Sequence, residues 1–205
     1  GIVSVAGLVV GVAGATTSTS AIATAGVAGL VAGALSMGAG EYVSVSSQRD
    51  TERAAVAKET RELAEDPEGE FEELVGLFQN RGLTRATAEK VAEELTAQDA
   101  LAAHSREELK IEPGEYVNPW AAALSSLLSF TVGAALPLIA ILVTPASVRI
   151  WVTFLAVLIA LFATGWVSAR LVGAPVRAAV ARNVIGGALA MAITYGIGAL
   201  LGTSI

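Results

Sequence analysis

A thioether and a carboxylate, Met37 and Glu41, stand four residues apart at the end of a long uncharged segment. Residues at this spacing share one face of a helix, about 6 Å apart along its axis. Carboxylate oxygens suit Mn²⁺ and Fe²⁺, and a thioether adds a preference for softer ions over Mg²⁺ or Ca²⁺. The pair therefore predicts a point through which a divalent ion passes. The alternative is that Glu41 is an ordinary helix-end acid at the lipid headgroups.

More polar side chains share this face if the helix continues. The sequence has no Gly or Pro between Glu41 and Asp66. At about 100° per residue, one stripe then contains Met37, Glu41, Gln48, Glu52, Glu59 and Glu62. Asp66-Pro67 ends the helix, because proline disfavours helical geometry in the residue before it. The sequence thus predicts one helix that carries acids from water to membrane depth.

The elements that hold these residues are mostly apolar. Of the 205 residues, 54% are hydrophobic and only 16% are charged, and the uncharged residues come in long blocks. About 20 apolar residues span a bilayer as a helix, so the blocks predict five spans. Their approximate ranges are 1–15, 21–47, 119–143, 149–170 and 178–202. The expected fold class is an all-α, five-span transmembrane bundle with a cytosolic helical metal-binding insert between spans two and three.

The charges are as segregated as the apolar residues. Between Asp50 and Tyr116 lie 18 of the 19 acids and eight of the 13 bases. This insert therefore carries a net charge of −10, which repels nucleic-acid phosphates and suits metal ions. The simpler alternative is a solvated acidic surface without a ligand. The expected domains are 1–49 with spans one and two, 50–117 with the acidic insert, and 118–205 with spans three to five.

The insert is expected to be helical. A short helix with Glu70 and Glu73 follows Asp66-Pro67, and Thr84 is placed to cap a further helix. The apolar spacing of that helix predicts a buried face made by Ala88, Val91, Ala92 and Leu95. A last helical turn carries Glu107 and Glu108.

The short loops indicate the orientation in the membrane. Arg170, Arg177 and Arg182 fall on the same side as the insert, and the opposite side has only Arg149. Arginine-rich short loops stay cytoplasmic, so a multi-pass membrane protein with a cytosolic insert is expected. The composition favours a bacterial cell membrane, or a vacuolar membrane if the source is eukaryotic.

Several function classes are not favoured. The sequence has no phosphate-binding G-x-x-x-x-G-K-[ST] loop and no cysteine. His104 is the only histidine, whereas a ferritin-like di-iron enzyme needs two Glu-x-x-His pairs. We therefore expect neither an enzyme nor a prosthetic group, and by base rate His104 lies on the surface of the insert.

The chain resembles the vacuolar iron transporter family over essentially its whole length. The resemblance is carried by the run EYVSVSSQRDTE (41–52), two E-x-x-E pairs, the REEL segment (106–109) and the insert after the second span. It implies a homodimeric exchanger that moves Fe²⁺, and often Mn²⁺, out of the cytosol against protons. It also implies a cytosolic metal-binding insert and a pathway at the dimer interface that uses the first two spans.

The resemblance also implies roles for individual residues. The residues that match the metal-binding glutamates of the insert are Glu59, Glu62, Glu70, Glu73 and Glu108. Met37 matches the methionine of the transport pathway. The family often has a methionine pair where this chain has His104 and Ser105, and His104 can itself bind iron or manganese. The family's first-span aspartate would precede Gly1 and is absent from this sequence.

Together these patterns predict a transporter in which the insert concentrates Fe²⁺ or Mn²⁺ as substrate ions and passes them to Met37 and Glu41. Metal entry at Glu41 is expected to displace a proton, so that the proton gradient drives export. Two alternatives stay open: a membrane-anchored metal buffer or sensor without transport, and a scaffold that binds no metal.

Overall fold

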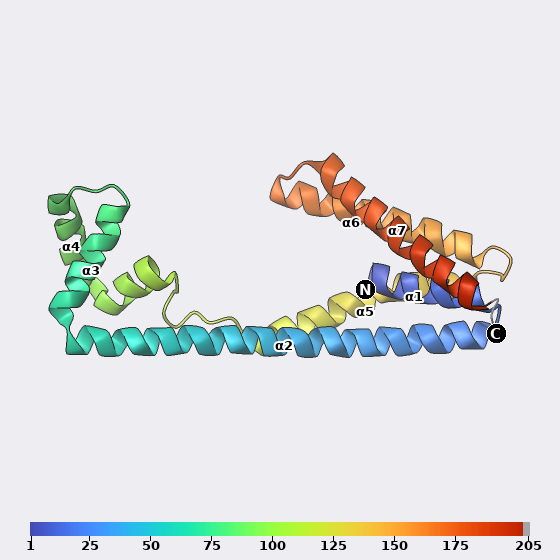
Figure 1. Ribbon diagram of the computed structural model, residues 1–205, viewed down its shortest axis with the longest axis horizontal. Helices are drawn as coiled ribbons and strands as arrows, with labels where there is room; N and C mark the ends of the chain where they lie inside the picture. The colour runs from blue at the N-terminus through green and yellow to red at the C-terminus, as the bar shows by residue number, and fades with distance from the viewer. Residues whose placement is uncertain (203–205) are drawn as a thin grey trace. The chain divides into compact units, whose positions relative to one another are not determined.

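The computed structural model describes residues 1–202, and every regular element in that range is a helix (Figure 1). The helices are α1 (Ile2–Ala15), α2 (Thr19–Glu65), α3 (Pro67–Asn80), α4 (Arg85–His104), the π-helix η1 (Ser105–Leu109), α5 (Pro119–Val143), α6 (Arg149–Val172) and α7 (Val176–Gly202). The all-α prediction is confirmed. The chain divides into two compact units, which we call the membrane unit (Gly1–Gly40 and Ala123–Ile205) and the insert (Glu41–Ala122).

Four helices of the described residues are long and apolar enough to cross a bilayer: α2, α5, α6 and α7. The fifth apolar helix, α1, has 14 residues. At 1.5 Å per residue it measures about 21 Å, less than the roughly 30 Å of bilayer hydrocarbon. The chain is therefore an integral membrane protein with four candidate spans, and the predicted count of five is not confirmed.

Helix α6 shows how the membrane unit separates an inner from an outer face. Its buried residues recur every four positions and include Thr153, Val157, Leu161, Gly165 and Ala169. Val157 and Leu161 pack with Ala6 of α1 and Met191 of α7 in one core. The side chains between them are large and exposed: Trp151, Leu155, Ile159 and Phe162. An apolar exposed face of this kind suits contact with lipid.

Small residues let α1 and α7 approach closely. A Cβ added at Gly198 of α7 would collide with the backbone carbonyl of Gly11, and one at Gly202 would meet the backbone of Ala15. Gly33 of α2 leaves room for the ring of Phe130 of α5. These glycines therefore serve helix packing inside one chain.

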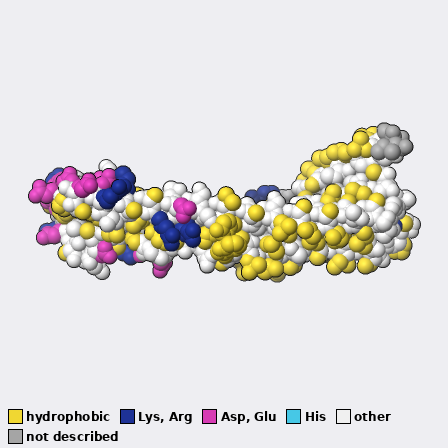
Figure 2. Space-filling view, turned by 90° about the horizontal axis from the view of Figure 1, so that it is seen from below, with side chains coloured by type: hydrophobic (Ala, Val, Ile, Leu, Met, Phe, Trp, Pro, Cys, Tyr) yellow, Lys and Arg dark blue, Asp and Glu magenta, His cyan; other side chains and the backbone are white. Residues whose placement is uncertain are grey.

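The insert has a core of its own between α3 and α4. Its buried members are Leu74, Val75, Phe78, Ala88, Ala92 and Ala103, with Val91 and Leu95 packed partly against them. The predicted buried face of α4 is thus confirmed. Thr84 is the N-cap residue of α4, as predicted, although its hydroxyl pairs with that of Thr87 and not with a backbone N–H. Charged side chains gather over the insert, as Figure 2 shows.

Candidate metal centre

The turn between α2 and α3 brings two glutamates of the insert toward each other. Helix α2 runs without interruption to Glu65, as predicted, and Asp66 then caps α3 by accepting a hydrogen bond from the N–H of Gly69 at 2.9 Å. Pro67 occupies the first position of α3, where its missing N–H costs nothing. The chain therefore changes direction at Asp66, and Glu70 of α3 comes to lie near Glu59 of α2.

A kink inside α4 brings in the histidine. Asp99 leaves helical geometry, with φ −167° and ψ 99°, and its carboxylate accepts a hydrogen bond from the N–H of Ala102 at 2.9 Å. Asp99 thus acts as an N-cap for the last turn of α4, which ends at His104. The π-helix η1 follows directly and carries Glu108 back beside His104.

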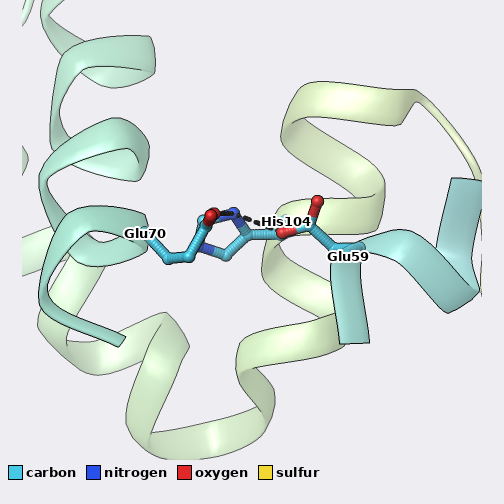
Figure 3. A group of neighbouring side chains, drawn as sticks. All are labelled: Glu59, Glu70 and His104. Atoms are coloured by element: carbon cyan, nitrogen blue, oxygen red, sulfur yellow. Dashed lines mark ion pairs between the residues drawn. The ribbon is translucent and has the colours of Figure 1, made fainter. Parts of the chain in front are cut away.

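Three ligand atoms converge in the insert. The Nδ1 of His104 lies 3.0 Å from a carboxylate oxygen of Glu59 and 3.5 Å from one of Glu70 (Figure 3). A third carboxylate oxygen, from Glu108, lies 3.9 Å from the same nitrogen. His104 is 1% exposed and Glu59 is 2% exposed, so the expectation of a surface histidine is wrong. The reason is the kink at Asp99, which turns the last residues of α4 inward.

The geometry fits a bound divalent ion better than a direct hydrogen bond. Nδ1 of His104 and Oε1 of Glu59 are both buried and, within residues 1–202, have no hydrogen-bond partner despite their 3.0 Å separation. Metal–ligand bonds of about 2.1 Å put neighbouring ligand atoms about 3 Å apart. The ligand atoms of Glu59, Glu70 and His104 all lie within 4.8 Å of one another. These residues therefore form a group able to hold one ion.

The electrostatics of the group favour a cation. Burial, and next the nearby carboxylates of Glu108 and Glu70, raises the pKa of Glu59 from 4.5 to about 7. Burial, followed by repulsion from Glu73, also raises the pKa of Glu70. Acids whose charged form is this unfavourable gain most when a divalent cation replaces the proton.

The other predicted acids of the insert stand at the edge of this group. Glu62 accepts a hydrogen bond from Lys58 at 2.6 Å, so its charge is already partnered at the surface. Glu73 is exposed, and its charge acts on Glu70. Among the described residues, only Glu59, Glu70 and His104 satisfy the geometry of a metal-binding group.

The predicted pathway pair lies elsewhere on α2. Met37 is 50% exposed and Glu41 is exposed, four residues apart in the same uninterrupted helix. Within the insert, Glu41 is not part of the group of Glu59, Glu70 and His104. Farther along the predicted stripe, Gln48 donates a hydrogen bond to Glu52 at 2.8 Å.

Sequence reasoning missed Asp99, the residue that positions the histidine. Its signal was present, because aspartate is a preferred N-cap and a poor residue for a helix interior. It stands five residues before His104, in an otherwise helical run.

Comparison with known proteins finds relatives over almost the whole length of the chain. The VIT family model matches residues 1–199. The chain is 44% identical over 190 residues to the vacuolar iron transporter of Acanthamoeba castellanii, covering 91% of this chain and 72% of that protein. It is 35% identical over 204 residues to vacuolar iron transporter homolog 1 of Arabidopsis thaliana, covering 99% and 78%. The corresponding values for vacuolar iron transporter 1 of Tulipa gesneriana are 31% over 192 residues, covering 92% and 77%.

These relatives carry the names of transporters, in agreement with the expectation that the chain is not an enzyme. The match extends from the first apolar helix into the last and includes the insert. The chain therefore belongs to the VIT family.

Proposed function

We propose that the protein is a membrane transporter that exports Fe²⁺, and also Mn²⁺, from the cytosol in exchange for protons. The observation that carries the proposal is the group of buried Glu59, half-buried Glu70 and buried His104. Its ligand atoms lie at metal-binding spacing, and two of its buried atoms have no hydrogen-bond partner in residues 1–202. The names of the relatives point to the same substrate.

The insert captures the ion. Its net negative charge raises the local concentration of cations. Two carboxylate oxygens and one imidazole nitrogen then replace part of the hydration shell. An imidazole ligand favours Fe²⁺ and Mn²⁺ over Mg²⁺ and Ca²⁺, which bind oxygen ligands almost exclusively. Glu62, Glu73 and Glu108 supply further oxygens for the ion as it enters and leaves.

Helix α2 links capture to transport. The ion moves from the group of Glu59, Glu70 and His104 to Glu41 and Met37, which lie four residues apart on one face of α2. Binding at Glu41 displaces a proton, and a proton returning from the other side releases the metal. Two copies of the chain form the pathway as a homodimer. The insert faces the cytosol, because Arg170, Arg177 and Arg182 favour that side.

Flux into liposomes tests the proposal. The purified chain is reconstituted, a pH step is imposed, and Fe²⁺ or Mn²⁺ uptake is followed with an enclosed metal-sensitive dye while a second dye reports protons. We expect metal flux to depend on the pH step and Glu41→Gln to abolish the coupling. Glu93→Gln is the matched control, because Glu93 is an exposed acid of α4 outside the candidate site.

The same assay separates transport from storage. A membrane-anchored buffer binds metal to the insert but shows no flux under any gradient. If Glu41→Gln transports metal with unchanged proton coupling, the assignment of Glu41 is wrong. If the wild type binds metal without flux, the transporter proposal itself fails.

A further inference from the structure

In the described part of the membrane unit, one cationic side chain is buried, that of Arg149, the first residue of α6. This residue is only 7% exposed. One terminal nitrogen, Nη2, donates a hydrogen bond to the hydroxyl of Thr19 at 3.2 Å. Its Nε and Nη1 are buried and have no hydrogen-bond partner within the described part of the chain. The guanidinium therefore keeps most of its hydrogen-bonding capacity unused.

No acidic side chain of the membrane unit can neutralise this charge. The sequence has no Asp or Glu in residues 1–40 or 123–205. A buried and unpaired arginine is costly, above all beside lipid. The hydroxyl of Thr153, one helical turn farther along α6, is also buried without a hydrogen-bond partner in residues 1–202. Two polar groups on one face of α6 thus lack partners, and one of them lacks a counter-charge.

The surroundings of Arg149 are suited to an anion. Thr19 is the first residue of α2, and the hydroxyl of Ser18 accepts a hydrogen bond from the N–H of Ala21 as an N-cap. The N-terminus of a long helix carries a partial positive charge and favours anions. The hydroxyls of Ser18 and Ser20 lie 3.0 Å apart beside it and can donate to an oxyanion.

The position along the helices indicates where such an anion comes from. Helix α6 has 24 residues, so it spans about 36 Å, slightly more than the hydrocarbon layer. A residue at its end therefore lies at the depth of the lipid headgroups, where phosphate groups are abundant. The other three arginines of the membrane unit, Arg170, Arg177 and Arg182, are exposed and need no such partner.

We propose that Arg149, with the N-terminus of α2, binds a phosphate oxyanion, and that a phospholipid headgroup supplies it. The phosphate compensates the guanidinium charge and fixes the first turns of α2 and α6 to each other. The bound lipid then stabilises the membrane unit. This site is independent of the metal centre and of the proposed transport.

Thermal unfolding in detergent tests the proposal with the full chain in dodecyl maltoside. The probes are dioleoyl phosphatidylglycerol, dioleoylglycerol, which has the same acyl chains without phosphate, and inorganic phosphate at constant ionic strength. At tenfold excess over the dissociation constant, phosphatidylglycerol is expected to raise the wild-type Tm by about 4 °C. We expect dioleoylglycerol to give no gain, Arg149→Met to lose the phosphatidylglycerol gain, and the control Arg182→Met to keep it.

The measurement with inorganic phosphate identifies the source of the oxyanion. A gain with phosphatidylglycerol alone supports the lipid, and an equal gain with inorganic phosphate supports the site but assigns it to a soluble anion. Arg149→Gln, which keeps a donor for Thr19 but no charge, replaces Arg149→Met if that variant does not fold. Equal gains in the wild type and the Arg149 variants, equal gains with dioleoylglycerol, or no gain with any probe would overturn the proposal.

Discussion

The insert and the membrane unit bury charge in opposite ways. The insert buries an acid, Glu59, beside an imidazole and further carboxylates, although basic side chains are plentiful on its surface. The membrane unit buries a base, Arg149, in a region without any acidic side chain. A protein rarely keeps a buried charge without a partner. On the two proposals above, each partner is an ion from outside the chain, a divalent cation in the insert and an oxyanion in the membrane unit.

The two units also differ in what holds their helices together. The insert packs α3 against α4 through larger apolar side chains such as Leu74 and Phe78. The membrane unit brings α1 and α7 together through glycines. Between helices that are surrounded by lipid, close van der Waals contact replaces the hydrophobic effect as the main source of stability. The predictions below test these differences, from the largest expected effect to the smallest.

Loss of a ligand in the insert should have the largest effect. Glu59→Gln and His104→Ala each remove a buried ligand atom, and we expect Mn²⁺ or Fe²⁺ affinity to fall by at least about 100-fold, since even outer-shell changes cost 10- to 100-fold. Isothermal titration calorimetry of the full chain in detergent measures the change. Glu93→Gln removes the same charge from an exposed position and should leave affinity unchanged. Equal losses in Glu59→Gln and Glu93→Gln would show that only net charge matters.

Filling the space between α1 and α7 with a methyl group should have the second-largest effect. Gly198→Ala places a methyl group against the backbone carbonyl of Gly11, and we expect it to destabilise the membrane unit by about 1–3 kcal/mol. Thermal unfolding followed by tryptophan fluorescence reports the change. The control is Gly186→Ala in the same helix, where an added Cβ meets no atom within 4 Å. A Gly198→Ala variant that is as stable as the wild type would contradict the close packing of α1 and α7.

The pH dependence of metal binding should be intermediate in size. Because the pKa of Glu59 is raised to about 7, a proton must leave before the metal binds below that pH. Affinity should therefore rise about tenfold per pH unit up to pH 7 and level off above it. Titrations with Mn²⁺ between pH 5.5 and 8 measure this slope. A flat profile would contradict the buried, protonated Glu59.

In the metal-free protein, the free energy of unfolding should change with pH in the opposite direction to the metal affinity. Between pH 4.5 and 7 the folded state keeps the Glu59 proton that the unfolded state has lost, so the folded state binds more protons. The stability of the insert should therefore decrease as the pH rises through this window. The decrease should be smaller in Glu59→Gln, in which the raised pKa of Glu70 still contributes.

Exposed charges of the insert should have the smallest effect. Arg85 bonds Glu72 at 2.9 Å and Glu89 at 2.7 Å, but all three side chains are largely exposed. Arg85→Met should therefore change stability by less than about 1 kcal/mol, and added salt should reduce the difference further. Urea unfolding of the detergent-solubilised chain measures it. A loss of stability above about 2 kcal/mol would contradict the expectation that exposed ion pairs of the insert contribute little.

Much of the helical framework was predictable from local signals. The absence of Gly and Pro before Asp66-Pro67 predicted the long α2, and the spacing of Ala88 and Ala92 predicted the buried face of α4. Both depend on neighbouring residues only, which a sequence shows directly. The range of α1 was also predictable, but whether α1 spans the bilayer was not, because an apolar run alone does not state how deeply a helix enters the membrane.

The position of His104 was not predictable in the same way. The helical periodicity that begins at Ala88 predicts one straight helix. In the structure, the carboxylate of Asp99 accepts a hydrogen bond from a backbone N–H, and the helix is kinked at this residue. The π-helix that follows changes the rotation of Glu108 again. The acids were therefore identifiable by type, but their convergence on one nitrogen depends on the tertiary structure.

Pulsed electron paramagnetic resonance of bound Mn²⁺ tests the central claim most directly. His104 is the only histidine in the sequence, so, once any polyhistidine tag has been removed, an imidazole ¹⁴N coupling can come from no other residue. We predict this coupling for one Mn²⁺ bound to the full chain, its loss in His104→Ala, and its retention in Glu93→Gln. Bound Mn²⁺ with only oxygen ligands in the wild type, or a coupling that persists in His104→Ala, would contradict a metal centre built on Glu59, Glu70 and His104.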